Sequence, residues 1–254
     1  MIPLRDSIPA SRPPVVRNAL IGACALGWLL QLMGGTGELA YGLGMVPARL
    51  LGDGEVVLQS GRVVALPDAY VPDWLTPLTC TFLHGGWLHF LGNMLFLWIF
   101  GDNVEDRFGR GSFLAFYLGS GIAASLAHLW SASDSPVPTI GASGAIAGVM
   151  GAYMFLYPKA RVLTLVPLGF LLVDMVLPAP FFLGYWFVLQ LVQGSLSSGA
   201  GGGVAWWAHI GGFVVGAAVA GGLRLTERLR PAPAPTPLSF TIRRRPRGPR
   251  RHGF

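Results

Sequence analysis

The chain has 254 residues, of which 52% are hydrophobic and only 12% are charged. About a quarter of the residues of an ordinary soluble domain are charged, so the composition excludes that class and indicates an integral membrane protein. Cys24 and Cys80 lie within or next to apolar runs and are expected to be buried, unpaired thiols. No Cys/His cluster has the spacing of a zinc site, and we expect neither a metal nor a cofactor.

Six apolar runs predict six membrane-spanning helices, because each is close to the ~20 residues that cross about 30 Å of hydrocarbon. They cover approximately residues 16–34, 84–102, 112–131, 141–158, 179–197 and 202–222. The expected fold is therefore an all-α bundle of six transmembrane helices. The expected organisation is a cytoplasmic segment 1–15, a membrane domain 16–222 and a tail 223–254.

A competing seventh span, residues 162–177, is short and contains a proline, a glycine and an aspartate. Arginines precede the first span, and nine arginines against one glutamate follow the last span. Basic flanks stay in the cytoplasm, so both ends are predicted to be cytoplasmic, which requires an even number of spans. We therefore expect residues 162–177 to form a loop or shallow element at the cytoplasmic face. Residues 35–83 are then an external loop.

The tail 223–254 is rich in proline and arginine and has almost no apolar pattern, which predicts disorder. Arginine clusters next to a membrane bind anionic lipid, and we expect the tail to anchor the topology in this way. Nucleic-acid binding is the alternative for such a tail. Nothing else in the chain supports it, and we expect no nucleic-acid partner.

Two polar residues stand inside apolar runs, where each costs free energy unless it has a partner or a function. Ser143 lies in the run GASGAIAGVMGAYMFLY, and His209 lies in AWWAHIGGFVVGAAVAGG. The predicted topology places both in the outer half of the bilayer at similar depth. A serine and a histidine are the minimum pair for nucleophilic catalysis, so we predict a catalytic dyad. No acidic residue lies at that depth in a span, and the dyad is expected to lack a carboxylate.

Small residues follow both members of this pair. Gly144, Gly148 and Gly151 share one side of the fourth predicted span, and Gly212 and Gly216 are four residues apart on the sixth. Such faces let helices approach until a hydroxyl and an imidazole can hydrogen-bond. Packing alone would also explain the glycines, and the two interpretations are compatible.

The second predicted span contributes further polar groups in HGGWLHFLGN. His89 and Asn93 are four residues apart and project from one helical face. Acyl transfer needs donors directed at the developing oxyanion, and a histidine N–H, an asparagine amide and the backbone N–H of Ser143 are suitable. Taken alone, His89 and Asn93 would more often be structural hydrogen-bonding residues. His84 is expected to order the start of this span, and His128 is expected to be a packing histidine.

Three segments resemble the rhomboid family of intramembrane serine proteases. They are FLHGGWLHFLGNMLFLWIFGDNVEDRFG, IGASGAIAGVMGAY and AWWAHIGGFVVG, which occur in the family's order. The resemblance implies a six-helix core with Ser143 as nucleophile and His209 as general base and acid. It implies that His89 and Asn93 stabilise the oxyanion together with the Ser143 amide.

The resemblance also implies supporting positions near the catalytic pair. His84 matches a family histidine ahead of the second span, and Gly141, Gly144 and Gly212 flank the catalytic residues. One departure is Ala147, since some members carry there an aromatic residue that packs under the catalytic histidine. Another is Trp74-Leu75, which stands where a Trp-Arg pair is common.

The sequence therefore predicts an intramembrane serine endopeptidase of a bacterial cytoplasmic membrane. The implied substrates are single-span membrane proteins, cut near the outer face where their helix unwinds easily. The alternative is a non-catalytic, rhomboid-like binder or chaperone of client helices, which would have no need of an intact dyad. A transporter would show repeated halves or interrupted helices, and we find no such repeat. The sequence indicates neither the physiological substrate nor the oligomeric state.

Overall fold

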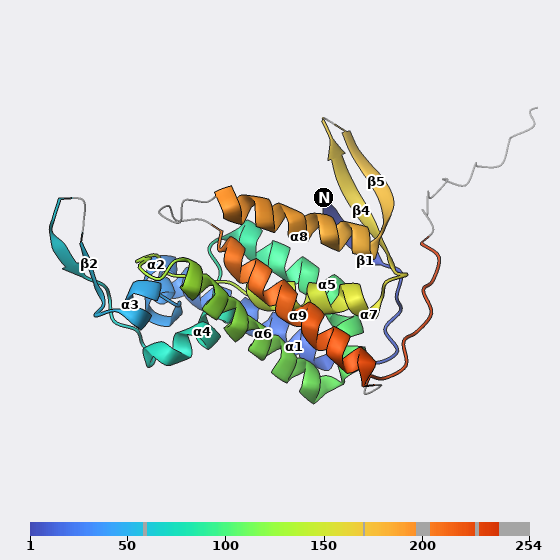
Figure 1. Cartoon of the computed structure of the whole chain (residues 1–254), viewed down its shortest axis with the longest axis horizontal. Helices are drawn as coiled ribbons and strands as arrows, with labels where there is room; N and C mark the ends of the chain where they lie inside the picture. Colours follow the sequence, from blue (N-terminus) through green and yellow to red (C-terminus); the bar gives the residue numbers. More distant parts are fainter. Residues whose placement is uncertain (58–59, 170, 197–203, 227–228, 239–254) are drawn as a thin grey trace, which may run out of the picture.

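The computed structural model describes residues 1–57, 60–169, 171–196, 204–226 and 229–238. Within them, long helices pack side by side at each of the predicted apolar runs (Figure 1). These helices are α1 (Val15–Gly34), α5 (Trp87–Phe108), α6 (Arg110–Ser131), α7 (Ser143–Leu156), α8 (Ala179–Leu196) and α9 (Trp206–Leu225). By length and composition, α1, α6 and α9 are long and apolar enough to cross a membrane.

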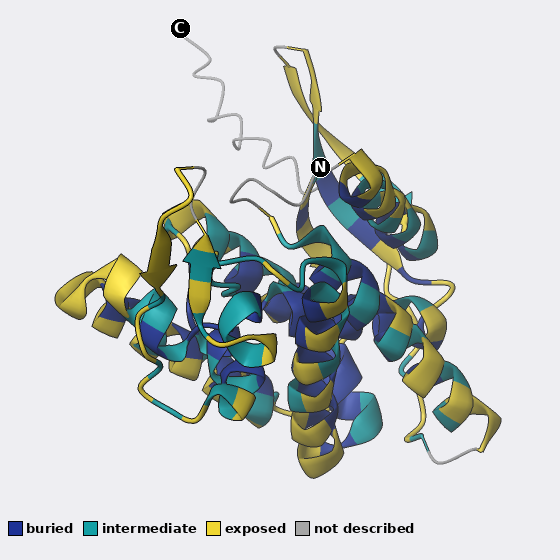
Figure 2. Ribbon diagram, turned by 60° about the vertical axis from the view of Figure 1, so that its left-hand side comes forward, coloured by how far each residue is buried: buried dark blue, intermediate teal, exposed yellow. Residues whose placement is uncertain are grey.

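Helix α7 forms the centre of the bundle. It contacts α5, α6, α8 and α9, and most of its residues are buried. Figure 2 shows the buried residues gathered in the interior and exposed residues along the outer flanks of the helices. Many of the exposed side chains are large and apolar, including Leu30 and Met33 on α1 and Phe181 and Val188 on α8. Apolar flanks of this extent are typical of surfaces that face lipid.

Helices α7 and α9 begin at the same end of the bundle and touch backbone to backbone. A Cβ atom added to Gly212 would collide with the Gly144 carbonyl, and one added to Gly216 would collide with the Gly148 carbonyl. Only glycine fits at these crossing points. The glycine spacing in the sequence therefore corresponds to a direct contact between the two helices, and it fixes which residues of α7 and α9 lie side by side.

The fold is mostly helical, but the expectation of an all-α fold is wrong for three segments, one of which lies in residues 35–83. Strands β1 (Ile2–Asp6), β4 (Arg161–Leu168) and β5 (Leu171–Pro178) form an antiparallel sheet in the order β1-β4-β5. In the run 162–177 the chain turns at Gly169, and Pro167, which would interrupt a helix, is accommodated in β4. The hairpin leaves the end of α7 and returns to the start of α8 at the same end of the bundle (Figure 1).

Residues 35–57 and 60–83 form a layer at the opposite end of the bundle (Figure 1). Helices α2 (Thr36–Leu43), α3 (Pro47–Leu51) and α4 (Thr76–Thr79) are joined there by the 3-10 turns η1 (Asp73–Leu75) and η2 (Cys80–Phe82) and the ribbon β2 (Glu55–Val57)–β3 (Val63–Ala65).

Arg49 holds this layer together. Its Nε lies 2.6 Å from Asp73 Oδ1, and its Nη1 donates to the carbonyls of Tyr41 and Pro67 at 2.9 and 2.7 Å. Trp74 is 72% exposed. In this chain the loop is therefore anchored through Arg49, and the Trp74 side chain contributes little packing within it.

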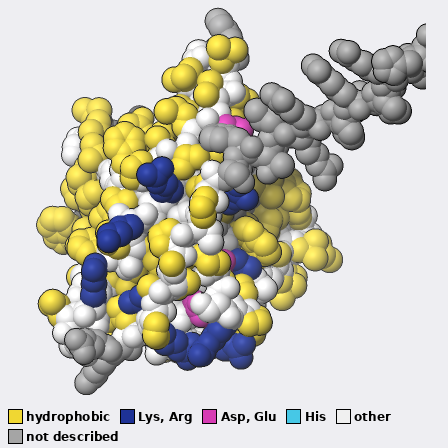
Figure 3. All heavy atoms as spheres, turned by 90° about the vertical axis from the view of Figure 1, so that its right-hand side faces the viewer, with side chains coloured by type: hydrophobic (Ala, Val, Ile, Leu, Met, Phe, Trp, Pro, Cys, Tyr) yellow, Lys and Arg dark blue, Asp and Glu magenta, His cyan; other side chains and the backbone are white. Residues whose placement is uncertain are grey.

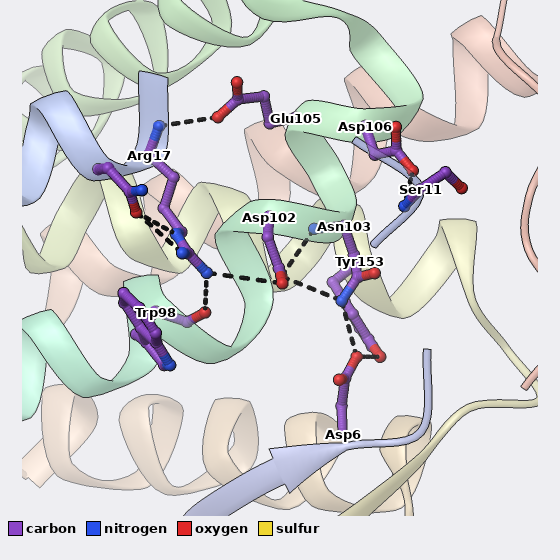
Figure 4. Close-up of polar contacts among 10 residues, drawn as sticks. Asp6, Ser11, Arg17, Trp98, Asp102, Asn103, Glu105, Asp106 and Tyr153 are labelled. Carbon is purple, nitrogen blue, oxygen red and sulfur yellow. Dashed lines mark hydrogen bonds and ion pairs between the residues drawn. The ribbon is translucent and has the colours of Figure 1, made fainter. Parts of the chain in front are cut away.

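A polar cluster joins the start of α1 to the far end of α5 (Figure 4). The Glu105 carboxylate accepts the backbone N–H groups of Val16 and Arg17 at 3.1 and 2.8 Å, and so satisfies donors in the first turn of α1. The Arg17 guanidinium donates to the Trp98 carbonyl at 2.8 Å and lies 3.5 Å from Asp102 Oδ2. Each buried charge thus has a partner, as a low-dielectric site requires.

Asp6 brings strand β1 into the same cluster. Its Oδ2 accepts a hydrogen bond from Asn103 Nδ2 at 2.9 Å and another from the Tyr153 hydroxyl (Figure 4). Burial raises the pKa of the Asp6 carboxyl to about 7, and the negative charge of Asp102 acts in the same direction. The N-terminal strand is therefore tied to α5 and α7 through a carboxyl that holds its proton up to near-neutral pH.

Part of the tail expected to be disordered lies along the domain. The Arg230 N–H donates to the Arg107 carbonyl at 3.2 Å, and the Thr236 N–H donates to the Ser7 carbonyl at 2.7 Å. Most of the tail arginines fall in residues 239–254, outside the described residues.

Exposed basic side chains gather at the end of the bundle where α5, α7 and α9 finish. Figure 3 looks onto this end and shows Lys and Arg side chains spread among apolar ones. They include Arg12, Arg110, Lys159, Arg161 and Arg224. This end of the bundle therefore has a positively charged surface.

Gly216→Ala should destabilise the protein, because its Cβ would collide with the Gly148 carbonyl and push α9 away from α7. Overpacking of this kind typically costs about 1–3 kcal/mol, and we expect a lower Tm for thermal unfolding in detergent. Gly222→Ala is the matched control on α9, since nothing lies within 4 Å of the added atom. Equal Tm values for the two variants would contradict the close packing.

Asp6→Asn should flatten the dependence of stability on pH. The pKa of Asp6 is raised to about 7 in the folded protein, whereas the unfolded chain releases this proton near pH ~4. The free energy of unfolding therefore falls as pH rises through this window, and asparagine has no proton to lose. Measured Tm values between about pH 5 and pH 8 should change less in the variant. Asp174→Asn, at an exposed carboxylate on β5, is the control and should keep the wild-type slope.

Candidate active site

The first turns of α7 and α9 bring Ser143 and His209 together. Ser143 is the first residue of α7, and its Oγ lies 2.8 Å from His209 Nε2. His209 is buried, and Ser143 is half-buried. The distance is that of a hydrogen bond, so the hydroxyl proton has an acceptor on the imidazole. The two residues are 66 positions apart in the sequence and meet because the glycine contacts align their helices.

Ser143 is recessed within the bundle because α7 is short. With 14 residues, α7 is about 21 Å long, whereas α6, with 22 residues, is about 33 Å long. Residues of the segment between them, including Ser135 and Thr139, line the same cavity as Ser143. The hydroxyl therefore faces this cavity and does not lie on the outer surface of the bundle.

A cavity of about 890 Å³ opens above Ser143. Its lining includes Ser143, His209, His89 and Asn93. His128, which we expected to be a packing residue, also lies in its wall. Within the described part of the chain, no acidic side chain lines this cavity. The predicted polar residues therefore share one space, and its polar groups are neutral side chains and backbone.

His89 is oriented so that one ring nitrogen faces the serine motif. Its Nδ1 accepts the Gly85 N–H at 3.2 Å, which leaves the ring proton on Nε2. A Cβ atom at Gly141, which has φ +134°, would stand 2.8 Å from His89 Nε2 and 3.5 Å from Ser143 Oγ. Glycine at this position therefore keeps open the space between the His89 donor and the serine.

Two further donors belong to residues that line the same cavity. Asn93 Nδ2 is buried and has no hydrogen-bond partner among the described residues. The Ser143 N–H begins α7, and such N–H groups have no carbonyl partner within their own helix. Together with His89 Nε2–H they form a set of donors around the space next to Ser143 Oγ, which suits an oxygen that gains negative charge.

His84 packs against His89 and is itself held by Gln31. Its backbone N–H donates to Gln31 Oε1 at 2.8 Å, and Gln31 Nε2 donates back to the His84 carbonyl at 3.0 Å. The His84 ring meets the His89 ring edge-on with centroids 5.4 Å apart. His84 is fully buried, so its contact with the site is through packing.

Sequence reasoning missed a residue that contacts the imidazole. Gln190 of α8 places its Oε1 2.7 Å from His209 Nδ1. The Trp186 ring lies alongside the imidazole with centroids 5.7 Å apart, and Trp206 meets it edge-on at 6.2 Å. Although Ala147 leaves no aromatic packing from α7, the imidazole is held from α8 and α9. The signal available in the sequence was a single amide within the apolar run FFLGYWFVLQLV.

The site lies within a region that matches a known protein family. Residues 72–225 match the rhomboid domain, which covers more than half of the chain and includes every site residue named above except Gln31. Rhomboid protease GluP of Bacillus subtilis is 36% identical over 147 residues, 58% of this chain and 26% of that protein. Rhomboid protein 1, mitochondrial, of Saccharomyces cerevisiae is 34% identical over 109 residues, 41% of this chain and 32% of that protein.

A third relative, the putative rhomboid protease YdcA of Bacillus subtilis, is 33% identical over 84 residues, 33% of this chain and 42% of that protein. The matches thus span less than half the length of these relatives. The domain match, residues 72–225, nevertheless includes the helices that carry the serine, the histidine and the surrounding donors. With the domain match extending from residue 72 to residue 225, this chain belongs to the rhomboid family.

Proposed function

We propose that this protein is an intramembrane serine endopeptidase that cleaves the transmembrane segments of single-span membrane proteins. The observation that carries the proposal is the 2.8 Å contact between Ser143 Oγ and His209 Nε2 in a recessed cavity. The names of two relatives, rhomboid protease GluP and putative rhomboid protease YdcA, support it.

The chemistry follows from the placement of the groups. Ser143 Oγ attacks the peptide carbonyl carbon while His209 Nε2 takes the hydroxyl proton. The carbonyl oxygen becomes an oxyanion beside Asn93 Nδ2, His89 Nε2–H and the Ser143 N–H. His209 then gives its proton to the amine nitrogen as the C–N bond breaks, which leaves an acyl-Ser143. Water attacks this ester, its proton passes to His209 and then to Ser143 Oγ, and the acid is released.

The cavity lining is suited to an unwound, apolar peptide. Trp87, Leu88, Trp186 and Trp206 line it together with the polar site residues. A transmembrane helix satisfies its own backbone groups, so the substrate must open locally before its carbonyl can reach Ser143. Segments with small, weakly helix-forming residues near the membrane surface meet this requirement most easily.

We propose a six-span arrangement in the cytoplasmic membrane of a bacterium, with both termini cytoplasmic. The exposed basic side chains at the β1 end of the bundle support this orientation, since basic residues are retained in the cytoplasm. Helix α7 is short but is surrounded by other helices, so it does not need to match the lipid thickness. The active site then opens to the external side, where water is available.

Ser143→Ala should abolish cleavage of a co-expressed single-span reporter, because among the described residues no other hydroxyl is paired with His209. Cleavage is measured by immunoblot of the released fragment. Ser195→Ala, at an exposed serine outside the cavity lining, is the control and should cleave like wild type. Equal cleavage by Ser143→Ala and wild type would exclude the proposed activity. If the wild-type protein binds the reporter without cleaving it, and a fluorophosphonate does not label Ser143, the protein is instead a non-catalytic binder of client helices.

Asn93→Ala should lower kcat by about 10²-fold, because removing one oxyanion donor typically costs this much or more. The residual rate is measured on a purified reporter in detergent. Asn18→Ala, an exposed position on α1, serves as control and should leave kcat unchanged. An unchanged kcat in Asn93→Ala would remove Asn93 from the oxyanion site while leaving the dyad in place.

A further inference from the structure

Gln190 stands out among the buried polar groups because it is the single polar residue of α8 that reaches the reacting pair. Its side chain is 6% exposed, whereas the neighbouring Val188, Leu191 and Val192 are exposed apolar residues. An amide inside a membrane-embedded helix costs free energy unless its donors and acceptor are satisfied. The placement of Gln190 therefore requires an explanation that packing alone does not give.

The hydrogen bonds of Gln190 fix the direction of its amide. Gln190 Nε2 donates to the Trp186 carbonyl at 3.3 Å, one turn earlier in α8. The oxygen Oε1 then points at His209 Nδ1, 2.7 Å away. An amide oxygen only accepts hydrogen bonds, so Nδ1 must be the donor of this contact.

This assignment determines the state of the second ring nitrogen. With the proton on Nδ1, Nε2 of the neutral imidazole has a free lone pair, and it faces Ser143 Oγ at 2.8 Å. That is the form of histidine that takes a proton from serine. The opposite tautomer would present an N–H to the serine and could not act as its base.

We propose that Gln190 is a positioning residue that holds His209 in the tautomer and orientation needed to deprotonate Ser143. The inference deepens the proposed protease function and rests on it. Gln190 occupies the place that a carboxylate takes in a Ser-His-Asp triad. A neutral amide directs the ring without placing an ionised group in the membrane interior, where an uncompensated charge is costly.

Gln190→Leu removes the acceptor while keeping a side chain of similar size. We expect kcat to fall by about 10- to 100-fold, because general-base catalysis is typically worth 10²–10⁴-fold and Trp186 and Trp206 still hold the ring. The KM for a purified reporter should stay within about twofold, since Gln190 contacts the histidine. Gln190→Glu restores an acceptor and should recover most of the lost kcat.

Gln193→Leu is the matched control. It is the same substitution on the same helix at an exposed position, and it should leave kcat and KM unchanged. Tm values of the variants in detergent separate a loss of folding from a loss of positioning. Equal kcat for Gln190→Leu and Gln193→Leu, in a protein whose cleavage depends on Ser143, would overturn the role of Gln190 and leave the protease function standing.

A second measurement does not depend on activity. In protein with ¹⁵N-labelled histidine, the ring signals of His209, assigned by comparison with His209→Ala, should show a protonated Nδ1 and an unprotonated Nε2 at neutral pH. In Gln190→Leu this preference should be lost. A wild-type ring protonated on Nε2 alone would overturn the inference, whatever the activity of the protein.

Discussion

The arrangement of the site depends on how closely α7 and α9 approach each other. In lipid there is little hydrophobic gain from bringing two apolar helices together, so their contact relies on close packing and on polar interactions between them. At Gly212 and Gly216 the backbone of α9 meets the carbonyls of Gly144 and Gly148 directly. Because the helices are parallel, this contact aligns their first turns, and Ser143 and His209 come within hydrogen-bond distance.

The second constraint is that polar groups in the interior must be satisfied without adding charge. The cavity around Ser143 is lined by neutral donors and acceptors within the described residues, and the imidazole is paired with an amide of α8. A buried carboxylate would stabilise a charged imidazole more strongly. It would also cost several kcal/mol to desolvate. The proposed Ser143–His209 dyad would therefore rely on neutral hydrogen-bonding groups rather than on a carboxylate.

The buried charged residues Arg17, Glu105 and Asp106 lie instead at the other end of the bundle, where they join the N-terminal segment to the helices. Glu105 receives the first N–H groups of α1, Arg17 lies between Trp98 and Asp102, and Asp6 connects β1 to Tyr153. These contacts link segments that are distant in sequence. The buried charges thus lie away from Ser143 and His209.

The apolar runs, the glycine spacing and the positions of Ser143, His209, His89 and Asn93 were readable from the sequence, because hydropathy and helical periodicity are local properties. The hairpin of β4 and β5 was not predicted as strands, since its pairing with β1 depends on residues at the distant N-terminus. Gln190 was also missed: one amide in an apolar run carries no local signal of its partner. Only the packing of α8 against α9 places it next to His209, 19 residues further along the chain. Residue types and their spacing therefore show which polar groups are available for chemistry. How the histidine is held follows only from the fold, because it depends on contacts between helices.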